Sequence, residues 1–362
     1  MPGLFIGLMS GTSLDGIDAV VSTFESVPRL LHSDYQPYDA RLRAELLTLQ
    51  APCDNELHRA ALTANELARA YAAAVTTLLK KASLASRDID ALGCHGQTIR
   101  HRPDAGYTMQ LVNAALLAEL TGITVVNDFR SRDIAAGGQG APLVPAFHQR
   151  LFHSASEHRV IVNIGGIANI TNLPANGSVS GFDCGPGNAL MDEWINLHQG
   201  KSYDNNGAWA ATGSVLPALH QHLFSNDYFL IPPPKSTGRD LFNLAWLRNA
   251  LESDEQPQDV QATLLELTAQ RITLGITQYC ASAQAVFVCG GGTHNQTLMA
   301  RIAALLPQRR VADTSALGLD PDWVEALAFA WLAHQTLRGE PGNLPQVTGA
   351  RGPRILGAVY PA

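Results

Sequence analysis

The sequence predicts an α/β protein of two lobes, in which mixed sheets are flanked by helices. Segments typical of strands alternate with segments typical of helices, and early hairpins add antiparallel pairs to the sheets. A chain of 362 residues is too long for one compact core and about right for two domains. Both halves also open on the same plan of a strand, a glycine-bearing turn and a second strand, near residues 4–24 and 160–173.

The N-terminal half begins with two apolar runs and contains one long helix. The stretch 54–81 is rich in Ala and Leu and contains neither Gly nor Pro, which favours a single helix. The expected elements are strands at 4–9 and 17–24, a helix at 54–81, a strand at 89–94, a helix at 113–120, a strand at 124–127 and a helix ending near 152.

Residues 153–158 are polar and show no apolar period, so we expect the boundary between the lobes there. Beyond it the expected elements are strands at 160–164, 170–173 and 179–183, helices at 188–198 and 260–280, a strand at 286–289 and a helix at 323–337. The predicted N-terminal lobe is 1–153, completed by 338–362, and the predicted C-terminal lobe is 154–337.

Composition narrows the class of protein. The net charge is −7 and the basic residues are scattered, so no basic patch indicates a nucleic-acid partner. No stretch approaches the ~20 apolar residues of a membrane-spanning helix, so no membrane partner is expected. The five cysteines are odd in number and include no CxxC pair, which argues against a zinc site or a disulfide framework. A reducing cytoplasm is therefore the expected location.

A turn rich in glycine and hydroxyl groups joins the first two strands, in the sequence GLMSGTSLDGID over 7–18. Phosphates need several hydrogen-bond donors directed at one point, which glycine backbone and hydroxyls supply. Two carboxylates in this turn, Asp15 and Asp18, suit Mg²⁺, directly or through water. The turn predicts a phosphate-binding loop made of Gly11, Thr12, Ser13, Leu14, Asp15, Gly16, Ile17 and Asp18. The alternative is an ordinary surface hairpin.

Two further glycine-bearing loops follow in the second half. The first supplies Asn163, Gly165 and Gly166. Because one such hairpin opens each half of the chain, the two loops are expected to close on the same polyphosphate. The other contains Gly290, Gly291 and Gly292 between a buried strand and a helix. Bare backbone there suits adenine or ribose, and a helix N-terminus favours phosphate. Taken alone, each loop is also compatible with a tight turn or close packing.

Together these loops resemble those of the sugar kinase, Hsp70 and actin superfamily. Further strings make the chain similar to the anhydro-N-acetylmuramic acid kinase family: GLMSGTSLDGID at 7–18, CHGQTIR at 94–100, DFRSRD at 128–133, AGGQGAPLVP at 136–145, GFDCGPGN at 181–188, KSTGR at 235–239 and VTGA at 347–350. The resemblance implies an actin-like, ribonuclease H-like ATPase fold with its active site in the cleft between the lobes. It also implies ATP and Mg²⁺ as cofactors, and a role for the enzyme in peptidoglycan recycling.

The family reaction implied by the resemblance joins two steps. Water opens the 1,6-anhydro bridge of 1,6-anhydro-N-acetylmuramic acid, and the freed O6 takes the γ-phosphate of ATP. The products are N-acetylmuramate 6-phosphate and ADP. This chemistry needs a base for the water and needs Mg²⁺ and backbone donors around the γ-phosphate.

The candidate base is Asp183, which ends a strand before a Cys-Gly-Pro-Gly break and occupies the position of the family's catalytic aspartate. Its alternative role is helix capping. Asp128, also at a strand end, is the rival base, unless it pairs with Arg130 or Arg132. These arginines are candidate ligands for the lactyl carboxylate, because guanidinium groups bind carboxylates bidentately. Glu325 opens the last helix and is expected to bind a sugar hydroxyl or orient the water, or to be an ordinary first-turn acid.

His95, Gln97 and Thr98 follow a strand end and are expected to line the sugar or phosphate side, although a buried histidine without a ligand fits His95 as well. Two other classes of function remain open. One is a hydrolase, either a glycosidase or a phosphatase; a glycosidase would need two facing carboxylates and no nucleotide site. The other is a nucleotide switch, which would bind ATP without sugar-dependent turnover. The sequence leaves the oligomeric state open, with a homodimer among the alternatives.

Overall fold

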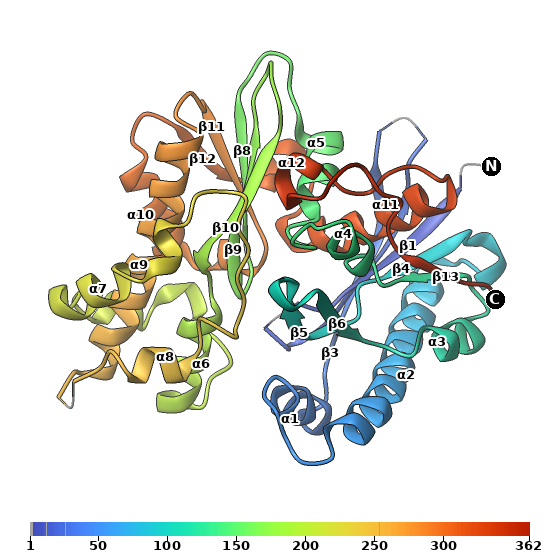
Figure 1. The fold of residues 1–362 in the computed structure, drawn as a ribbon, viewed down its shortest axis with the longest axis horizontal. Helices are drawn as coiled ribbons and strands as arrows, with labels where there is room; N and C mark the ends of the chain where they lie inside the picture. Colours follow the sequence, from blue (N-terminus) through green and yellow to red (C-terminus); the bar gives the residue numbers. More distant parts are fainter. Residues whose placement is uncertain (1–2, 12, 26, 253) are drawn as a thin grey trace. The chain divides into compact units, whose positions relative to one another are not determined.

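The computed structural model describes residues 3–11, 13–25, 27–252 and 254–362. They form two compact units (Figure 1). The first unit is the chain up to Leu151 together with Trp323–Ala362, and the second is Phe152–Asp322. Each unit contains a sheet, flanking helices and a buried apolar core of its own.

In the first unit the strands of the main sheet lie in the order β13-β7-β4-β1-β2-β3. The strands are β1 Leu4–Met9, β2 Gly16–Thr23, β3 Arg29–Pro37, β4 Ala91–Cys94, β7 Val125–Asn127 and β13 Ala358–Tyr360, with β5 Gln97–Arg102 and β6 Tyr107–Leu111 in a separate hairpin. The helices are α1 Ala40–Thr48, α2 Glu56–Ala82, α3 Ala114–Thr121, α4 Ser131–Ala135, α5 Val144–Phe152, α11 Val324–Leu337 and α12 Pro345–Thr348.

Three strands of this sheet end at the same edge. β1 is parallel to β4, and β4 is parallel to β7, so the residues that follow Met9, Cys94 and Asn127 lie along one border of the sheet. The first glycine loop, the His95–Gln97 turn and the Asp128–Arg130 segment are therefore neighbours, although they are far apart in the sequence.

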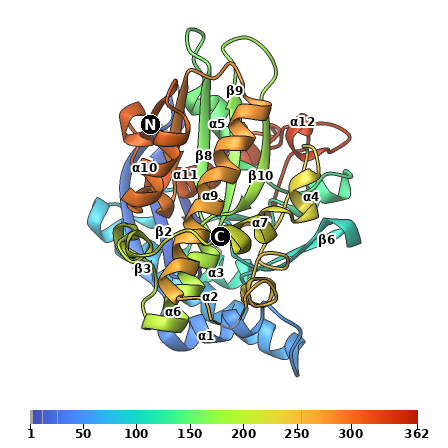
Figure 2. The same ribbon diagram turned by 90° about the vertical axis from the view of Figure 1, so that its left-hand side faces the viewer.

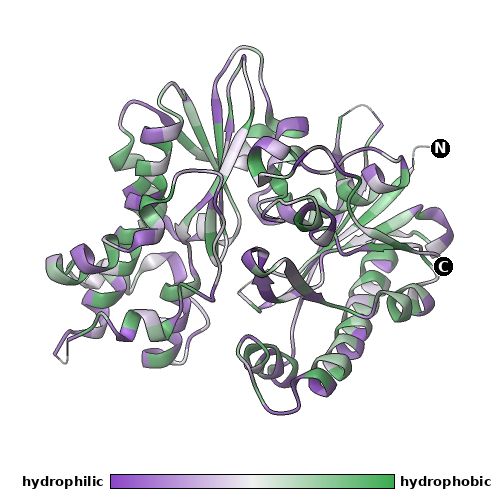
Figure 3. Ribbon diagram, in the orientation of Figure 1, coloured by the Kyte–Doolittle hydropathy of each residue, from purple (hydrophilic) through white to green (hydrophobic). Residues whose placement is uncertain are grey.

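Helices cover both faces of this sheet. α2 packs against β2 and β3, and its buried residues Leu67, Tyr71, Val75 and Leu78 follow the helical period, which Figure 3 shows as alternating hydrophobic and hydrophilic colouring. On the other face α11 packs on β1 and β4. A Cβ atom on Gly7 would lie 1.8 Å from the carbonyl oxygen of Ala326, and one on Gly93 would lie 2.0 Å from that of Phe329. Both positions need glycine because the helix backbone touches the strands.

In the second unit the strands lie in the order β10-β9-β8-β11-β12. The strands are β8 Arg159–Ile164, β9 Ile167–Leu173, β10 Ser180–Pro186, β11 Ala285–Cys289 and β12 Arg310–Asp313. The helices are α6 Ala189–Gln199, α7 Pro217–Phe224, α8 Leu244–Arg248, α9 Pro257–Tyr279 and α10 Gln296–Leu305. α9 lies along the sheet and packs on β9 and β10 (Figure 2). β8 and β11 are parallel, so the loops that follow them lie at one edge.

The two units share a topology. In chain order, five strands of each sheet are arranged as third, second, first, fourth and fifth: β3-β2-β1-β4-β7 in one and β10-β9-β8-β11-β12 in the other. In both, the first two connections are antiparallel hairpins and the first and fourth strands are parallel. This is the ribonuclease H-like arrangement, so the predicted fold class is confirmed.

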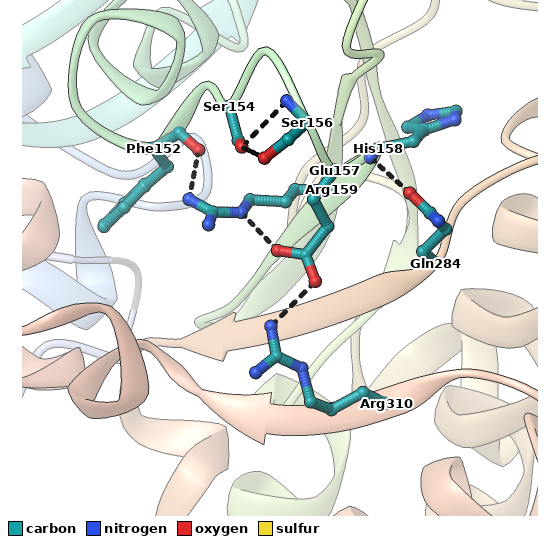
Figure 4. A network of polar contacts seen from close by, with 8 residues as sticks. All are labelled: Phe152, Ser154, Ser156, Glu157, His158, Arg159, Gln284 and Arg310. Carbon is teal, nitrogen blue, oxygen red and sulfur yellow. Dashed lines mark hydrogen bonds and ion pairs between the residues drawn. The ribbon is translucent and has the colours of Figure 1, made fainter.

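The polar segment predicted as the boundary is attached to the second unit (Figure 4). The Glu157 carboxylate accepts from Arg159 Nε at 2.7 Å and from Arg310 at 2.9 Å. Arg159 also donates to the carbonyl oxygen of Phe152 at 3.0 Å, and the His158 backbone N–H donates to the Gln284 side chain at 3.0 Å. These bonds hold the segment to the starts of β8 and β12.

The last long helix differs from the prediction. The sequence placed 323–337 in the C-terminal lobe, but α11 packs on β1 and β4 of the first unit. A mostly apolar helix does not reveal which sheet it covers. The sequence also predicted no elements between 199 and 259, where the structure has α7, α8 and several short turns. All five cysteines are free thiols, and none of the described helices combines the length and apolar character needed to cross a bilayer.

Candidate active site

The first glycine loop is supported by the turn that follows β4. Gln97 Nε2 donates to the carbonyl oxygen of Gly11 at 3.0 Å. The Ser10 hydroxyl donates to the carbonyl oxygen of Gly96 at 3.2 Å and is hydrogen-bonded to the Tyr71 hydroxyl. Thr12, predicted to bind phosphate, lies outside the described residues. Gln97, predicted to line the sugar or phosphate side, therefore supports the first glycine loop.

Within this loop only some of the predicted side chains are accessible. Leu14 and Ile17 are fully buried in the core of the first unit, so any contact they make with a ligand is through the backbone. Leu14 has a φ of 57°, and its carbonyl oxygen accepts from Arg43 Nε at 3.1 Å. Gly16 cannot carry a side chain, because a Cβ atom would lie 2.4 Å from the Gln36 carbonyl oxygen. At Gly11 the nearest atom to such a Cβ would be the Ser13 hydroxyl oxygen, at 3.7 Å.

Of the two predicted metal ligands, Asp15 lies in the turn before β2 and Asp18 lies near the start of β2. Asp15 is exposed and its carboxylate accepts from the Ser13 hydroxyl at 2.8 Å. Asp18 is half-buried in β2, where it pairs with Met9 of β1. No cluster of three or more His, Cys, Asp or Glu side chains occurs among the described residues. This donor set fits a Mg²⁺ ion that keeps most of its ligands as water and phosphate oxygens.

His95 and Arg130 form a buried pair at the same sheet edge. Arg130 donates to His95 Nε2 through Nε at 3.2 Å and through a terminal nitrogen at 3.0 Å, and it also donates to the Gly140 carbonyl oxygen at 2.8 Å. A guanidinium has no acceptor, so His95 Nε2 must be unprotonated and the ring proton resides on Nδ1. Burial, assisted by the Arg130 charge, holds the pKa of His95 well below its usual value. His95 is therefore a neutral acceptor that orients Arg130.

The loop after Arg130 is held by a carboxylate that the sequence did not single out as a site residue. Asp133 is fully buried, and it accepts from Gly140 N at 2.8 Å, from Asn343 at 2.6 Å and from the Thr348 hydroxyl at 2.8 Å. It thus joins the predicted strings at 128–133, 136–145 and 347–350. Three residues distant in sequence converge on it, which no local pattern indicates.

The other candidates of the first unit lie in four separate segments. Asp128 directly follows β7 and has a φ of 61°. Arg132 is exposed on α4. Thr98 lies in β5, where its hydroxyl accepts from Gln110 at 3.2 Å. Glu325 is half-buried in the first turn of α11.

In the second unit Asp183 lies in β10, where the pairing with β9 shifts by one residue between Asp183 and Gly185. Gly185 has a φ of 141°, a conformation that favours glycine. The bulge re-aims the strand next to Asp183, as bulges near functional sites commonly do. Asp183 is 5% exposed. The residue at the N-cap position of α6 is Asn188, not Asp183.

Two chain segments surround Asp183. Its backbone N–H donates to the Lys235 carbonyl oxygen at 3.1 Å, and its carboxylate Oδ2 accepts from Thr237 N at 3.0 Å. The buried Tyr228 hydroxyl donates to its carbonyl oxygen at 2.7 Å. These bonds fix both the backbone and one carboxylate oxygen of Asp183.

The two glycine loops of the second unit lie together beside the start of α6. Asn188 N donates to the Gly165 carbonyl oxygen at 2.8 Å, and Gly187 N donates to that of Gly166 at 2.9 Å. A Cβ atom on Gly290, which has a φ of 81°, would lie 2.4 Å from Asn163 Oδ1. Glycine is therefore required where the loops meet. A Cβ atom on Gly291 would lie 3.9 Å from Asn188 Nδ2, whereas one on Gly292 would lie 2.3 Å from the Ile164 side chain.

The sequence candidates thus form one group in each unit. The first group contains the loop at 10–15 with His95, Gln97 and Arg130, and the second contains Asp183 with Asn163, Gly165, Gly166 and the 290–292 loop. Sequence reasoning missed Asp133, Tyr228 and the role of Lys235–Thr237. The KSTGR string was a signal for the last of these, without an indication of its partner.

Comparison with known sequences gives consistent matches over the whole chain. The model of a family described as anhydro-N-acetylmuramic acid kinase matches residues 3–362. A protein of that name from Nitrosospira multiformis is 59% identical over 361 residues, covering 99% of each chain. Another, from Thiobacillus denitrificans, is 60% identical over 364 residues, covering 99% of this chain and 97% of the relative.

Solved structures resemble the chain only distantly. The activator of the 2-hydroxyisocaproyl-CoA dehydratase from Clostridium difficile with bound ADPNP has a TM-score of 0.47 at 13% identity, covering 92% of this chain and 96% of that chain. A ROK family glucokinase from Streptomyces griseus, in complex with glucose and AMPPNP, has a TM-score of 0.42 at 14% identity, covering 92% of this chain and 100% of that chain. Scores this low carry no argument about activity.

Proposed function

The chain belongs to the anhydro-N-acetylmuramic acid kinase family, and on that premise we propose how its residues carry out the reaction. It is a kinase that opens the 1,6-anhydro ring of 1,6-anhydro-N-acetylmuramic acid with water and transfers the γ-phosphoryl group of ATP to O6. The products are N-acetylmuramate 6-phosphate and ADP, which places the enzyme in peptidoglycan recycling.

Asp183 is the proposed base. Water is a weak nucleophile toward the acetal carbon C1, so its proton must leave as the C1–O bond forms. The carboxylate of Asp183 takes that proton, the C1–O6 bond breaks, and O6 attacks the γ-phosphorus while the bond to the β-phosphate oxygen breaks. One observation supports this proposal most strongly: Asp183 is buried at a strand bulge and is held from two sides. Thr237 N donates to its carboxylate, and the Lys235 carbonyl oxygen accepts from its backbone N–H.

The glycine loops are the proposed nucleotide contacts. Gly11 and Ser13 of the first unit and Gly165, Gly166 and Gly291 of the second present backbone or hydroxyl donors. No atom lies closer than 3.7 Å to the place of a Cβ atom at Gly11, Gly165 or Gly291, which supports this, since a phosphate or a ribose needs close access to backbone. Asp15 and Asp18 would hold Mg²⁺, which neutralises charge on the phosphates when bound.

Arg130 is the proposed ligand of the lactyl carboxylate, with Arg132 as the second candidate. Two acceptors, His95 Nε2 and the Gly140 carbonyl oxygen, fix the Arg130 guanidinium, and Asp133 holds Gly140 in turn. A guanidinium oriented in this way loses little side-chain entropy when a carboxylate binds, which favours recognition of a charged substituent.

Product identification tests the proposed reaction. Incubation with ATP, Mg²⁺ and the anhydro sugar is expected to give a sugar product heavier than the substrate by one water and one phosphoryl group. A product that gained water alone would identify a glycosidase, and ADP formed with unchanged sugar would identify an ATPase.

A further inference from the structure

In the segment at 235–239, with the sequence KSTGR, the backbone holds Asp183, but the Lys235 side chain has no part in the reaction as described so far. The first residue of the segment lies directly against Asp183, since the carbonyl oxygen of Lys235 accepts from Asp183 N at 3.1 Å. Two residues later, Thr237 N donates to the Asp183 carboxylate at 3.0 Å. The segment therefore contacts both the backbone and the carboxylate of the proposed base.

The Lys235 side chain is buried beside the same residue. Lys235 is 8% exposed, and its ammonium donates to the Tyr228 carbonyl oxygen at 3.2 Å and lies 4.6 Å from the centre of the Tyr228 ring. Tyr228 in turn donates its hydroxyl to the Asp183 carbonyl oxygen. In the described part of the chain no carboxylate forms an ion pair with Lys235. A buried ammonium without such a partner is costly, which points to a purpose other than stability.

Four ionisable groups surround this ammonium. Asp183, Cys184, Tyr228 and Arg271 all interact with it or with one another. Burial raises the pKa of the Cys184 thiol and of the Tyr228 hydroxyl, so both are neutral. Arg271 is stacked between Phe224 and Phe229, 3.3 and 3.7 Å from the ring centres. The cluster therefore holds two cations and one carboxylate, and only Lys235 belongs to the segment that brackets Asp183.

We propose that Lys235 is a positioning residue, whose buried charge beside Tyr228 and Asp183 keeps the Asp183 carboxylate ionised for proton abstraction. The inference rests on the proposed role of Asp183. A nearby positive charge favours the charged form of a carboxylate, and loss of that charge makes protonation easier. Protonated Asp183 cannot take a proton from water. The charge of Lys235 therefore sets the lowest pH at which the enzyme remains active.

The test is the pH dependence of kcat/KM in two Lys235 variants. Lys235→Gln removes the charge and keeps a donor for the Tyr228 carbonyl oxygen, whereas Lys235→Arg keeps the charge. In Lys235→Gln the acid limb of the profile is expected to move to higher pH by about one unit or more. In Lys235→Arg it is expected to stay near that of the wild type. An unmoved acid limb in Lys235→Gln overturns the proposal.

Two further variants separate charge from packing. Tyr228→Phe removes the bond to the Asp183 carbonyl oxygen without changing charge, so the rate should fall while the acid limb stays in place. A shift in Tyr228→Phe equal to that in Lys235→Gln would mean that packing, and not charge, moves the limb, and would overturn the inference. Lys201→Gln, at an exposed lysine of the same unit, is the control for loss of a positive charge and should leave the profile unchanged.

The outcomes also separate this inference from the proposed function. Absence of sugar-dependent ADP formation in the wild type would refute the function itself. A wild type that turns over normally, with an acid limb insensitive to Lys235→Gln, would refute only the role of Lys235.

Discussion

Replacement of Asp183 by Asn is the most informative single change, because the structure predicts a loss of chemistry without a loss of fold. The backbone bonds of Asp183, to the Lys235 carbonyl oxygen and from the Tyr228 hydroxyl, do not involve its side chain and persist in the variant. The amide oxygen of Asn can still accept from Thr237 N, as carboxylate Oδ2 does at 3.0 Å. What Asn cannot do is take a proton from water.

The expected loss is that of a positioned general base, about 10²–10⁴-fold in rate, or about 2.7–5.4 kcal/mol in the activation barrier. The loss is expected at the upper end, because phosphoryl transfer to O6 follows ring opening. Single-turnover ADP formation measures it. Nucleotide binding, measured separately, should be almost unchanged, since the glycine loops do not include residue 183.

A companion variant, Asp128→Asn, tests the rival base. Asp128 lies directly before the segment that carries Arg130 and Arg132, so its replacement should alter sugar binding more than the chemical step. Near-normal single turnover in Asp183→Asn, together with a large loss in Asp128→Asn, would refute the assignment.

The remaining predictions concern sugar recognition and pH. Arg130→Ala should reduce the preference for the muramyl sugar over an anhydro sugar without the lactyl group by about 1.5–3 kcal/mol, and Arg132→Ala should reduce it less; equal preferences in wild type and both variants would place the carboxylate elsewhere. Burial lowers the pKa of His148 to about 3 and that of His101 to about 4, and burial with the nearby Arg130 holds the pKa of His95 well below normal. Below about pH 6.5 the unfolded chain binds protons on these rings and the folded chain does not, so stability should fall as the pH falls from about 6.5 towards 4. Urea unfolding at a series of pH values checks this, and a midpoint that rises on acidification over that range would contradict it.

Much of the candidate site could be predicted because its signals are local. The turns at 10–16 and 165–166 combine glycine with the ends of apolar runs, and such turns keep their character whatever surrounds them. The candidate residues that follow β1, β4 and β7 lie together because these parallel strands end at one edge, which the structure shows and the sequence analysis did not predict. The burial of Leu14 and Ile17 was not foreseen, since a turn pattern does not show which of its side chains face the core.

The features that escaped prediction depend on contacts between distant segments. Asp133 binds groups at positions 140, 343 and 348, and no pattern near Asp133 indicates those partners. Lys235 and Thr237 bind Asp183 although they lie more than fifty residues further along the chain. They belong to an irregular segment whose sequence shows no periodicity. The assignment of α11 to the wrong unit has the same origin, because Gly7 and Gly93 reveal its place only once the helix is seen against them.

The proposed reaction couples ATP consumption to the opening of an anhydro sugar. Its most direct test is ADP release by the wild-type protein with ATP and Mg²⁺, in the presence and absence of 1,6-anhydro-N-acetylmuramic acid, with a parallel series in which EDTA removes the metal. The account predicts ADP release that requires both the sugar and Mg²⁺. ADP release at the same rate without the sugar would contradict it and would indicate an ATPase instead.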